Sequence, residues 1–145
     1  MTNEFQIRQP KASDFNFIHS TFLKSMHKDS KLGKSVPTTL FFAEFAKTID
    51  YLLEQAEVLI ACDKDNSDVI FGYLIYEPGI VHYAFTKLAF RRLHIARDLI
   101  LSVFPQADSF QFSLKTSCSK KITEKYPNLT YNPFLLMKKG SQWKL

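Results

Sequence analysis

The stretch IVHYAFTKLAFRRLHIARDLI, residues 80–100, decides the fold because it holds a strand, a basic loop and a helix in succession. Residues 80–86 are rich in β-branched and aromatic side chains, which predicts a strand. The apolar residues of 95–104 recur at four-residue spacing and predict a helix that Pro105 closes.

This order of elements determines how two strands can pair. The segment FQFSLKT, residues 110–116, predicts another strand directly after the helix. A strand, a helical crossover and a second strand form the connection that parallel pairing requires. The basic loop 87–94 should therefore lie at the carboxyl end of a strand, which is where open α/β sheets bind ligands.

Two arginines, Arg91 and Arg92, stand just before the predicted helix, at an end that already carries partial positive charge. The first N–H groups of a helix have no partner within it and favour an anion. Guanidinium groups add a bidentate geometry that matches phosphate. Two interpretations stay open: the loop binds a phosphate that Arg91, Arg92 and Arg97 screen, or it is a solvated basic turn.

The whole chain predicts the order β-α-α-β-β-β-α-β-α-β. Before the deciding stretch we expect a strand at 4–10 and then a helix capped by Ser13, whose apolar residues are Phe15, Ile18, Phe22 and Met26. A polar loop should follow at 28–35. Pro37 should open a second helix, whose apolar face is Phe42, Phe45, Ile49 and Leu52 or Leu53. Strands at 58–62 and 69–76 should form an antiparallel meander with 80–86. After 110–116 we expect a short helix at 119–126 and a strand-like segment at 129–138, interrupted at Asn132–Pro133.

Length and charge bound the class of protein. The 145 residues fit a single domain, 1–145, and 46% hydrophobic residues can build a core. The net charge of +5 and a pI of about 9.2 favour an anionic partner, namely nucleic acid, a phosphorylated ligand or an acidic protein face. Ordinary surface lysines are the alternative. Since no RRM, helix-turn-helix or zinc signature is present, we expect no specific nucleic acid.

The sequence also indicates the cellular compartment of the protein and whether it binds a metal. It contains neither an 18-residue apolar stretch nor an apolar signal region, so we expect a soluble cytoplasmic protein without membrane contact. Cys62 and Cys118 are far apart and match no zinc spacing, which predicts no metal site and fits a reducing compartment.

The segment 80–100 resembles the acetyl-CoA-binding motif of the GCN5-related N-acetyltransferases (GNAT), Gln/Arg-x-x-Gly-x-Gly/Ala, which follows a strand and opens a helix. Arg91 fills its first position and Ala96 its sixth, while Phe90 and Ile95 fit the surrounding pattern. His94 fills the fourth position, where the family prefers Gly, because Gly lets the backbone approach a phosphate.

The chain also resembles small acetyltransferase-like phage proteins, notably in DFNFIHSTFLKS and TKLAFRRLHIARDLI. The resemblance implies an α/β (α+β) fold with a mixed, mostly antiparallel sheet of about six or seven strands and about four flanking helices. It further implies acetyl-CoA as cofactor. The implied cofactor-binding residues are Phe85, Thr86, Lys87, Arg91, Arg92, Leu93, His94, Ile95, Ala96, Arg97 and Ser119.

In that set the end of the 80–86 strand would hold the pantetheine arm and the thioester, and the N–H groups of 92–97 would hold the pyrophosphate. Ser119 stands seven residues before Tyr126, where family members often carry Asn. Tyr126 itself matches the tyrosine that protonates the departing thiolate in the family.

A base must take a proton from the acceptor amine, and His82 is the candidate because histidine titrates in the useful range. In an alternating strand Ile80, His82, Ala84 and Thr86 share one face, which would put His82 near the thioester. A hydrogen-bonded structural histidine is the alternative, and Glu77 is a weaker candidate base.

The resemblance therefore implies an acetyl-CoA-dependent N-acetyltransferase that moves an acetyl group directly to a primary amine of a protein or small molecule. The alternative is a protein with this fold that binds CoA or a host protein without turnover. The family walls its acceptor site with the first two helices, and here that region carries Lys24, Lys28, Lys31 and Lys34. These lysines would suit an acidic acceptor or an acidic protein face. The C-terminal segment could also complete the sheet of a second copy, giving a homodimer.

Overall fold

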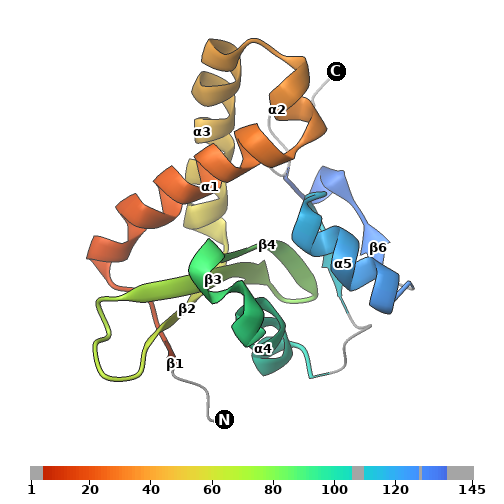
Figure 1. The fold of residues 1–145 in the computed structure, drawn as a ribbon. Coiled ribbons are helices and arrows are strands. Elements are labelled where there is room, and N and C mark those ends of the chain that lie inside the picture. Colours follow the sequence, from red (N-terminus) through yellow and green to blue (C-terminus); the bar gives the residue numbers. More distant parts are fainter. Residues whose placement is uncertain (1–4, 106–109, 128, 137–145) are drawn as a thin grey trace.

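The structure is a computed structural model that describes residues 5–105, 110–127 and 129–136 (Figure 1). Its described part contains six strands, five α-helices and three 3-10 helices. Their order is β1 (Phe5–Arg8), η1 (Ala12–Asp14), α1 (Phe15–Asp29), α2 (Lys31–Ser35), α3 (Thr38–Gln55), β2 (Glu57–Asp63), β3 (Ile70–Glu77), β4 (Ile80–Thr86), η2 (Leu88–Leu93), α4 (Ile95–Val103), β5 (Gln111–Phe112), α5 (Ser117–Lys125), β6 (Thr130–Tyr131) and η3 (Pro133–Leu136). No helix in these residues is long and apolar enough to cross a bilayer.

The six strands form one mixed sheet in chain order. Strands β1 to β4 pair antiparallel, and β2 to β4 form the predicted meander. The pairs β4–β5 and β5–β6 are parallel, with α4 as the crossover between β4 and β5. The α/β fold class with a mostly antiparallel sheet is therefore confirmed.

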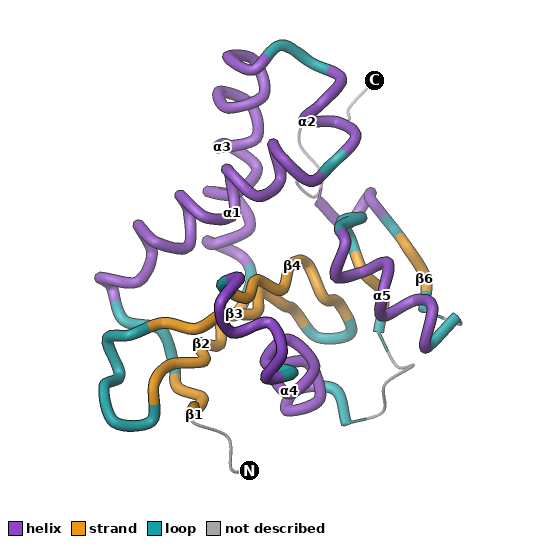
Figure 2. Tube along the Cα trace, viewed as in Figure 1, coloured by secondary structure: helices purple, strands orange, loops and turns teal. Residues whose placement is uncertain are grey.

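Both faces of the sheet are covered, and each carries its own core. Helices α1 and α3 pack on one face through residues such as Phe22, which stacks on Tyr83 of β4 at a centroid distance of 4.2 Å. Helix α4 packs on the other face through Ile95 and Leu99, both 1% exposed or less. Figures 1 and 2 show α1 and α3 on one side of the strands and α4 on the other. Strand β4 therefore separates two helical layers.

The N-terminal helices differ from the prediction in three ways. Ser13 does not cap α1, because it lies within η1, and its neighbour Asp14 pairs instead with Arg8 at 2.8 Å. The expected polar loop 28–35 contains the short helix α2, whose N-cap Ser30 accepts a hydrogen bond from the Gly33 N–H at 3.0 Å. The buried face of α3 uses Phe41 where Phe42 was expected.

The C-terminal strands are shorter than predicted. Strand β5 covers two residues of the expected 110–116, because the chain leaves β4 after Val81 pairs with Phe112. Within the expected 129–138, the two residues of β6 are followed by η3 at Pro133–Leu136, and residues 137 and 138 lie outside the described part. The Asn132 side chain accepts from the Phe134 N–H at 3.2 Å, which turns the chain at the expected interruption.

Candidate functional site

The site begins where β4 and β5 separate. The two strands pair only at Ile80↔Gln111 and Val81↔Phe112, and β4 then continues to Thr86 without β5 beside it. The pairing of β4 with β3 also shifts at this point, from Tyr76↔Val81 to Ile75↔Tyr83, which leaves His82 as an extra residue. This β-bulge reorients the following side chains. The second half of β4 therefore presents one edge to an opening in the sheet.

A groove of about 780 Å³ occupies this opening. Its walls come from the last turn of α1, the end of β4, the start of α4, and α5, which Figure 1 shows around the open end of the sheet. The lining residues are Ser25, Lys28, Asp29, Tyr83, Ala84, Phe85, Thr86, Leu88, Arg91, His94, Ile95, Ala96, Arg97, Ile100, Leu101, Phe110, Thr116, Lys121, Ile122, Lys125 and Tyr126. Because α1 and α4 cover opposite faces of the sheet, the groove passes from one face to the other.

Helix α4 points its N-terminus into this groove. His94 is its N-cap and has a left-handed backbone, with φ 58°, and its side chain makes no capping hydrogen bond. The His94 side chain therefore does not take the first N–H groups of the helix, which have no partner within the helix itself. Among the described residues, His94 is the only one other than glycine with a positive φ. It therefore stands at a position that glycine would fit best.

A glycine in β3 lets α4 come this close. Gly72 pairs with Thr86, and a Cβ on Gly72 would lie 2.3 Å from the Phe85 carbonyl oxygen and 3.3 Å from the Ile95 side chain. The Arg91 Nε donates to the Thr86 carbonyl at 3.2 Å and ties the η2 segment to the end of β4. The end of β4 and the start of α4 are therefore held together by close packing and a hydrogen bond.

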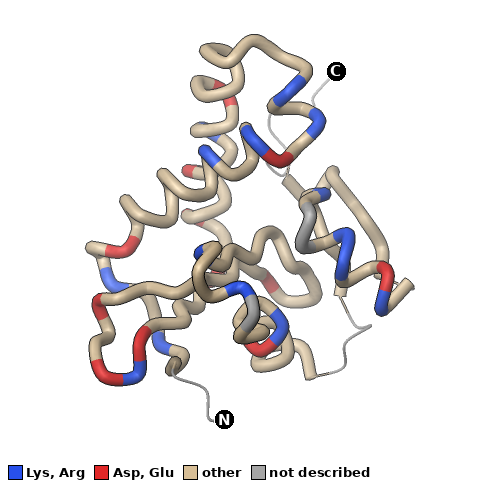
Figure 3. The backbone as a smooth tube through the Cα atoms, in the orientation of Figure 1, with Lys and Arg blue, Asp and Glu red and all other residues tan. Residues whose placement is uncertain are grey.

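The charge of the groove is mostly positive. Five cationic residues line it, namely Lys28, Arg91, Arg97, Lys121 and Lys125, against a single carboxylate, Asp29, among the described lining residues. Arg97 is partly neutralised by its ion pair with Asp98 at 3.1 Å. Figure 3 shows the basic residues on α1, α4 and α5. Cations around an uncapped helix N-terminus favour an anionic ligand such as a phosphate.

Solved structures share this architecture at low sequence identity. A GCN5-related N-acetyltransferase from Rhodopseudomonas palustris aligns with a TM-score of 0.60 and 12% identity over 86% of this chain and 82% of its own. YjaB from Escherichia coli, in its apo form, aligns with a TM-score of 0.60 and 12% identity over 85% and 79%. The chain has the GNAT fold.

The acetyltransferase yncA from Salmonella typhimurium, solved with its cofactor acetyl-CoA, aligns with a TM-score of 0.50 and 14% identity over 86% of this chain and 79% of its own. No protein-family model matches the sequence, and no curated protein matches it. At these identities the likeness defines the GNAT fold, and function has to be argued from the groove.

Within this fold His82 does not face the groove. Its imidazole is buried, with Nε2 2.6 Å from Glu77 Oε2 and Nδ1 2.7 Å from Ser113 Oγ. Burial lowers the pKa of His82, while the Glu77 hydrogen bond acts in the opposite direction. With Glu77 ionised, the neutral ring donates through Nε2 and accepts the Ser113 hydroxyl through Nδ1.

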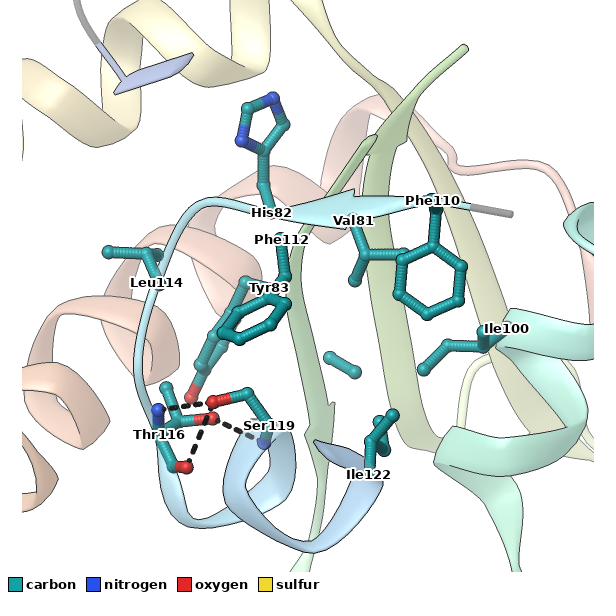
Figure 4. A pocket seen from close by; sticks show the side chains of 11 residues that line it. Val81, His82, Tyr83, Ile100, Phe110, Phe112, Leu114, Thr116, Ser119 and Ile122 are labelled. Carbon is teal, nitrogen blue, oxygen red and sulfur yellow. Dashed lines mark hydrogen bonds between the residues drawn. The ribbon is translucent and has the colours of Figure 1, made fainter. Parts of the chain in front are cut away.

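The expected common face of Ile80, His82, Ala84 and Thr86 is wrong because of the bulge. Val81 and Ala84 pack in the α4 core, whereas Tyr83 and Phe85 pack in the α1–α3 core. In Figure 4 the His82 ring points away from Ile122 and Ser119. The buried ring with two hydrogen bonds fits the structural histidine that the sequence left open as the alternative.

Tyr126 and Ser119 occupy different places on α5. Tyr126 is half-buried at the C-cap of α5, lines the groove and packs against the core beneath α4. Ser119 exchanges hydrogen bonds with Thr116 in a capping box, as the dashed lines in Figure 4 show. Ser119 lines a small cavity of about 20 Å³ that adjoins the groove and shares Tyr83, Thr116 and Ile122 with it; this is about the space of one water molecule.

The predicted residues are mostly brought together. Those that line the groove are Phe85, Thr86, Arg91, His94, Ile95, Ala96, Arg97 and Tyr126. Lys87 and Leu93 do not line it: the Lys87 Nζ lies 5.1 Å from the Phe17 ring centroid, and Leu93 packs on the α4 core. The side chain of Arg92 lies outside the described part.

Sequence reasoning missed the groove residues that come from distant segments. Ser25 and Asp29 belong to α1, and Lys121 and Lys125 belong to α5. The four-residue spacing within each pair was a usable signal, because such residues share one face of a helix. Gly72 gave only the weak signal of an isolated glycine in a strand, which often marks close backbone approach.

Proposed function

We propose that the protein is an acetyl-CoA-dependent N-acetyltransferase that moves an acetyl group directly to a primary amine. The observation that carries this proposal is the cationic groove in front of the uncapped N-terminus of α4, at the point where β4 and β5 part. The GNAT fold of the chain and the acetyl-CoA in yncA support it.

The chemistry of the groove fits such a cofactor. Its phosphates need N–H donors and cations, which the first turn of α4, Arg91 and Arg97 supply. The pantetheine arm carries amides, and the edge of β4 from Tyr83 to Thr86 has no β5 partner beside it. A volume of about 780 Å³ is ample for a ligand of that size. We assign the phosphates to the start of α4 and the thioester to the end of β4.

When bound, acetyl-CoA would supply a thioester whose acetyl carbon an amine nitrogen can attack. Tyr126 lines the same groove and is the proposed donor of the proton that the departing thiolate takes. His82 is engaged on both ring nitrogens, so we assign it to holding the β4 bulge in place rather than to taking the amine proton. Water in the open groove is then the proposed carrier of that proton.

The second candidate is a protein that binds CoA without turnover. The hydrogen-bonded burial of His82 favours it, because the strand then offers no side-chain base to the groove. The two candidates share the cofactor site and differ only in transfer.

The test measures thermal stability of the full chain with and without acetyl-CoA, and then release of free thiol with amines added. A ligand at a hundred times its Kd adds about 2.7 kcal/mol of stability, a shift of several degrees. We expect this shift in the native chain and in the control Lys24→Glu, and its loss in Arg91→Glu. Lys24 is the matched control because it is exposed and does not line the groove.

A shift with amine-dependent thiol release supports the acetyltransferase. A shift without thiol release for any amine supports the non-catalytic binder. The absence of a shift at millimolar acetyl-CoA overturns both candidates.

A further inference from the structure

The last turn of α1 places three different polar groups along the groove. Ser25, Lys28 and Asp29 all line it, and the spacings of three and four residues put them on one face of the helix. They supply a hydroxyl, an ammonium and a carboxylate side by side. Figure 3 shows acidic and basic residues adjoining at this end of α1.

These groups stand on the opposite side of β4 from the start of α4. Helix α1 packs with Tyr83 and Phe85 on one face of the sheet, whereas α4 packs with Val81 and Ala84 on the other. If the phosphates lie at the start of α4, the α1 side of the groove remains for the acceptor. The inference therefore rests on the proposed function and concerns the second substrate.

The charges on this side select among amines. Asp29 is the one carboxylate among the described residues of the groove, and it stands at the C-terminal end of α1, where the helix dipole also favours a cation. Lys28 beside it favours an anion. A polyamine would meet Asp29 but also five cationic residues along the groove, so repulsion opposes its entry.

We propose that the acceptor is a small amine that carries a carboxylate next to its reacting nitrogen, as a free α-amino acid does. Asp29 attracts the ammonium group, Lys28 pairs with the carboxylate, and the Ser25 hydroxyl can hydrogen-bond to either. In the transfer the ammonium first loses one proton to water, and the free amine nitrogen bonds to the acetyl carbon. The carbon–sulfur bond breaks, the thiolate takes a proton from Tyr126, and the nitrogen gives its second proton through water to the Tyr126 phenolate, so that one proton is released to solvent overall.

The experiment compares amino acids with amines that differ only by the carboxylate. The full chain with acetyl-CoA receives L-lysine or 1,5-diaminopentane, L-phenylalanine or 2-phenylethylamine, and L-serine or ethanolamine, and thiol release is followed. We expect kcat/KM to be higher by about tenfold or more for the amino acid of a pair. The reason is that the free energy of a hydrogen bond to a charged group corresponds to at least about this factor.

Variants then assign the preference to its residues. Lys28→Gln should remove the preference within each pair, whereas Lys24→Gln, one turn away and outside the groove, should keep it. Asp29→Asn should raise KM about tenfold for both members of a pair. The exposed Glu44→Gln should leave KM unchanged. None of these variants should alter the stabilisation by acetyl-CoA.

The outcomes separate the inference from the proposed function. Equal or better use of the decarboxylated amines, or of a peptide N-terminus, overturns the inference and leaves the acetyltransferase standing. An unchanged preference in Lys28→Gln also overturns it. Stabilisation by acetyl-CoA without transfer to any amine overturns the acetyltransferase itself, and the inference with it.

Discussion

The imidazole Nδ1 of His82 lies 2.7 Å from the hydroxyl oxygen of Ser113, just beyond the two residue pairs that join β4 to β5. The other ring nitrogen lies 2.6 Å from Glu77, at the end of β3. One buried side chain of β4 thus contacts the end of β3 and the residue that follows β5, at the point where the groove opens. The shape of the groove therefore depends on contacts behind it.

Ser113→Ala should destabilise the protein by about 1–3 kcal/mol, because it leaves the buried Nδ1 of His82 without a partner. Urea unfolding followed by circular dichroism measures the change. Ser102→Ala is the matched control, since the Ser102 hydroxyl also donates a hydrogen bond, to the Leu99 carbonyl, but is exposed. Equal stability of the two variants would show that the His82 link does not hold the strands.

The stability of the fold should fall as the pH is lowered through the range just below 6.5. Burial lowers the pKa of His82 in the folded state, so between that pKa and the unfolded value the unfolded chain binds the extra proton. Stability then rises with pH across this window, with a slope of at most about 1.4 kcal/mol per pH unit.

Unfolding at about pH 5.5 and about pH 7.5 measures this slope. The side-chain amide of His82→Gln can also donate and accept hydrogen bonds but does not titrate. In this variant the rise of the unfolding free energy between these two pH values that comes from residue 82 should disappear. His19→Gln should keep it, because His19 is half-exposed and paired with Asp50 on the surface. A slope that survives in His82→Gln contradicts the assignment to this histidine.

Local sequence patterns predicted those parts of the fold that local physics decides. Strand β4 has the predicted bounds, 80–86, and α4 ends one residue before the predicted end. The crossover rule then gave the parallel pair and the position of the basic loop. These inferences need only spacing, chirality and chain connectivity.

The bulge and the far walls of the groove were beyond the reach of such patterns. The bulge at His82 arises from the register of β4 against β3, and it breaks the alternation on which the expected face depended. Asp29 and Lys125 reach the groove from segments almost a hundred residues apart, and only tertiary packing brings them together. The short helix α2 was readable, since Ser30 stands three residues before Gly33, the spacing of a helix cap.

His94→Gly should stabilise the protein by about 1 kcal/mol, because the left-handed φ of 58° is strained for histidine and free for glycine. Thermal unfolding measures this gain. His94→Ala removes the same ring but keeps the strain, so it should show no gain. Under the proposed function His94→Gly should bind acetyl-CoA at least as tightly as the native chain. A loss of stability in His94→Gly would mean that the His94 ring contributes more than the strain removes.

Gly72→Ala should destabilise by about 1–3 kcal/mol, since the new methyl group has to displace the Phe85 carbonyl, which lies 2.3 Å away. The displaced end of β4 should also weaken the stabilisation by acetyl-CoA. Gly79→Ala is the control: its φ of +76° makes alanine costly there, but open space surrounds it and the groove is unaffected. Stabilisation by acetyl-CoA that is equal in both variants would separate the end of β4 from the cofactor site.

Tyr126→Phe should lower kcat about a hundredfold, because the variant cannot give a proton to the departing thiolate, and general acids contribute at least that much. Binding of acetyl-CoA should stay unchanged, since the ring, which packs against the core beneath α4, is kept. Thiol release measures the first effect and thermal shift the second. Tyr131→Phe is the control, because Tyr131 is 39% exposed and does not line the groove. A Tyr126→Phe enzyme with native kcat would exclude this hydroxyl as the acid, and a water molecule would then protonate the thiolate.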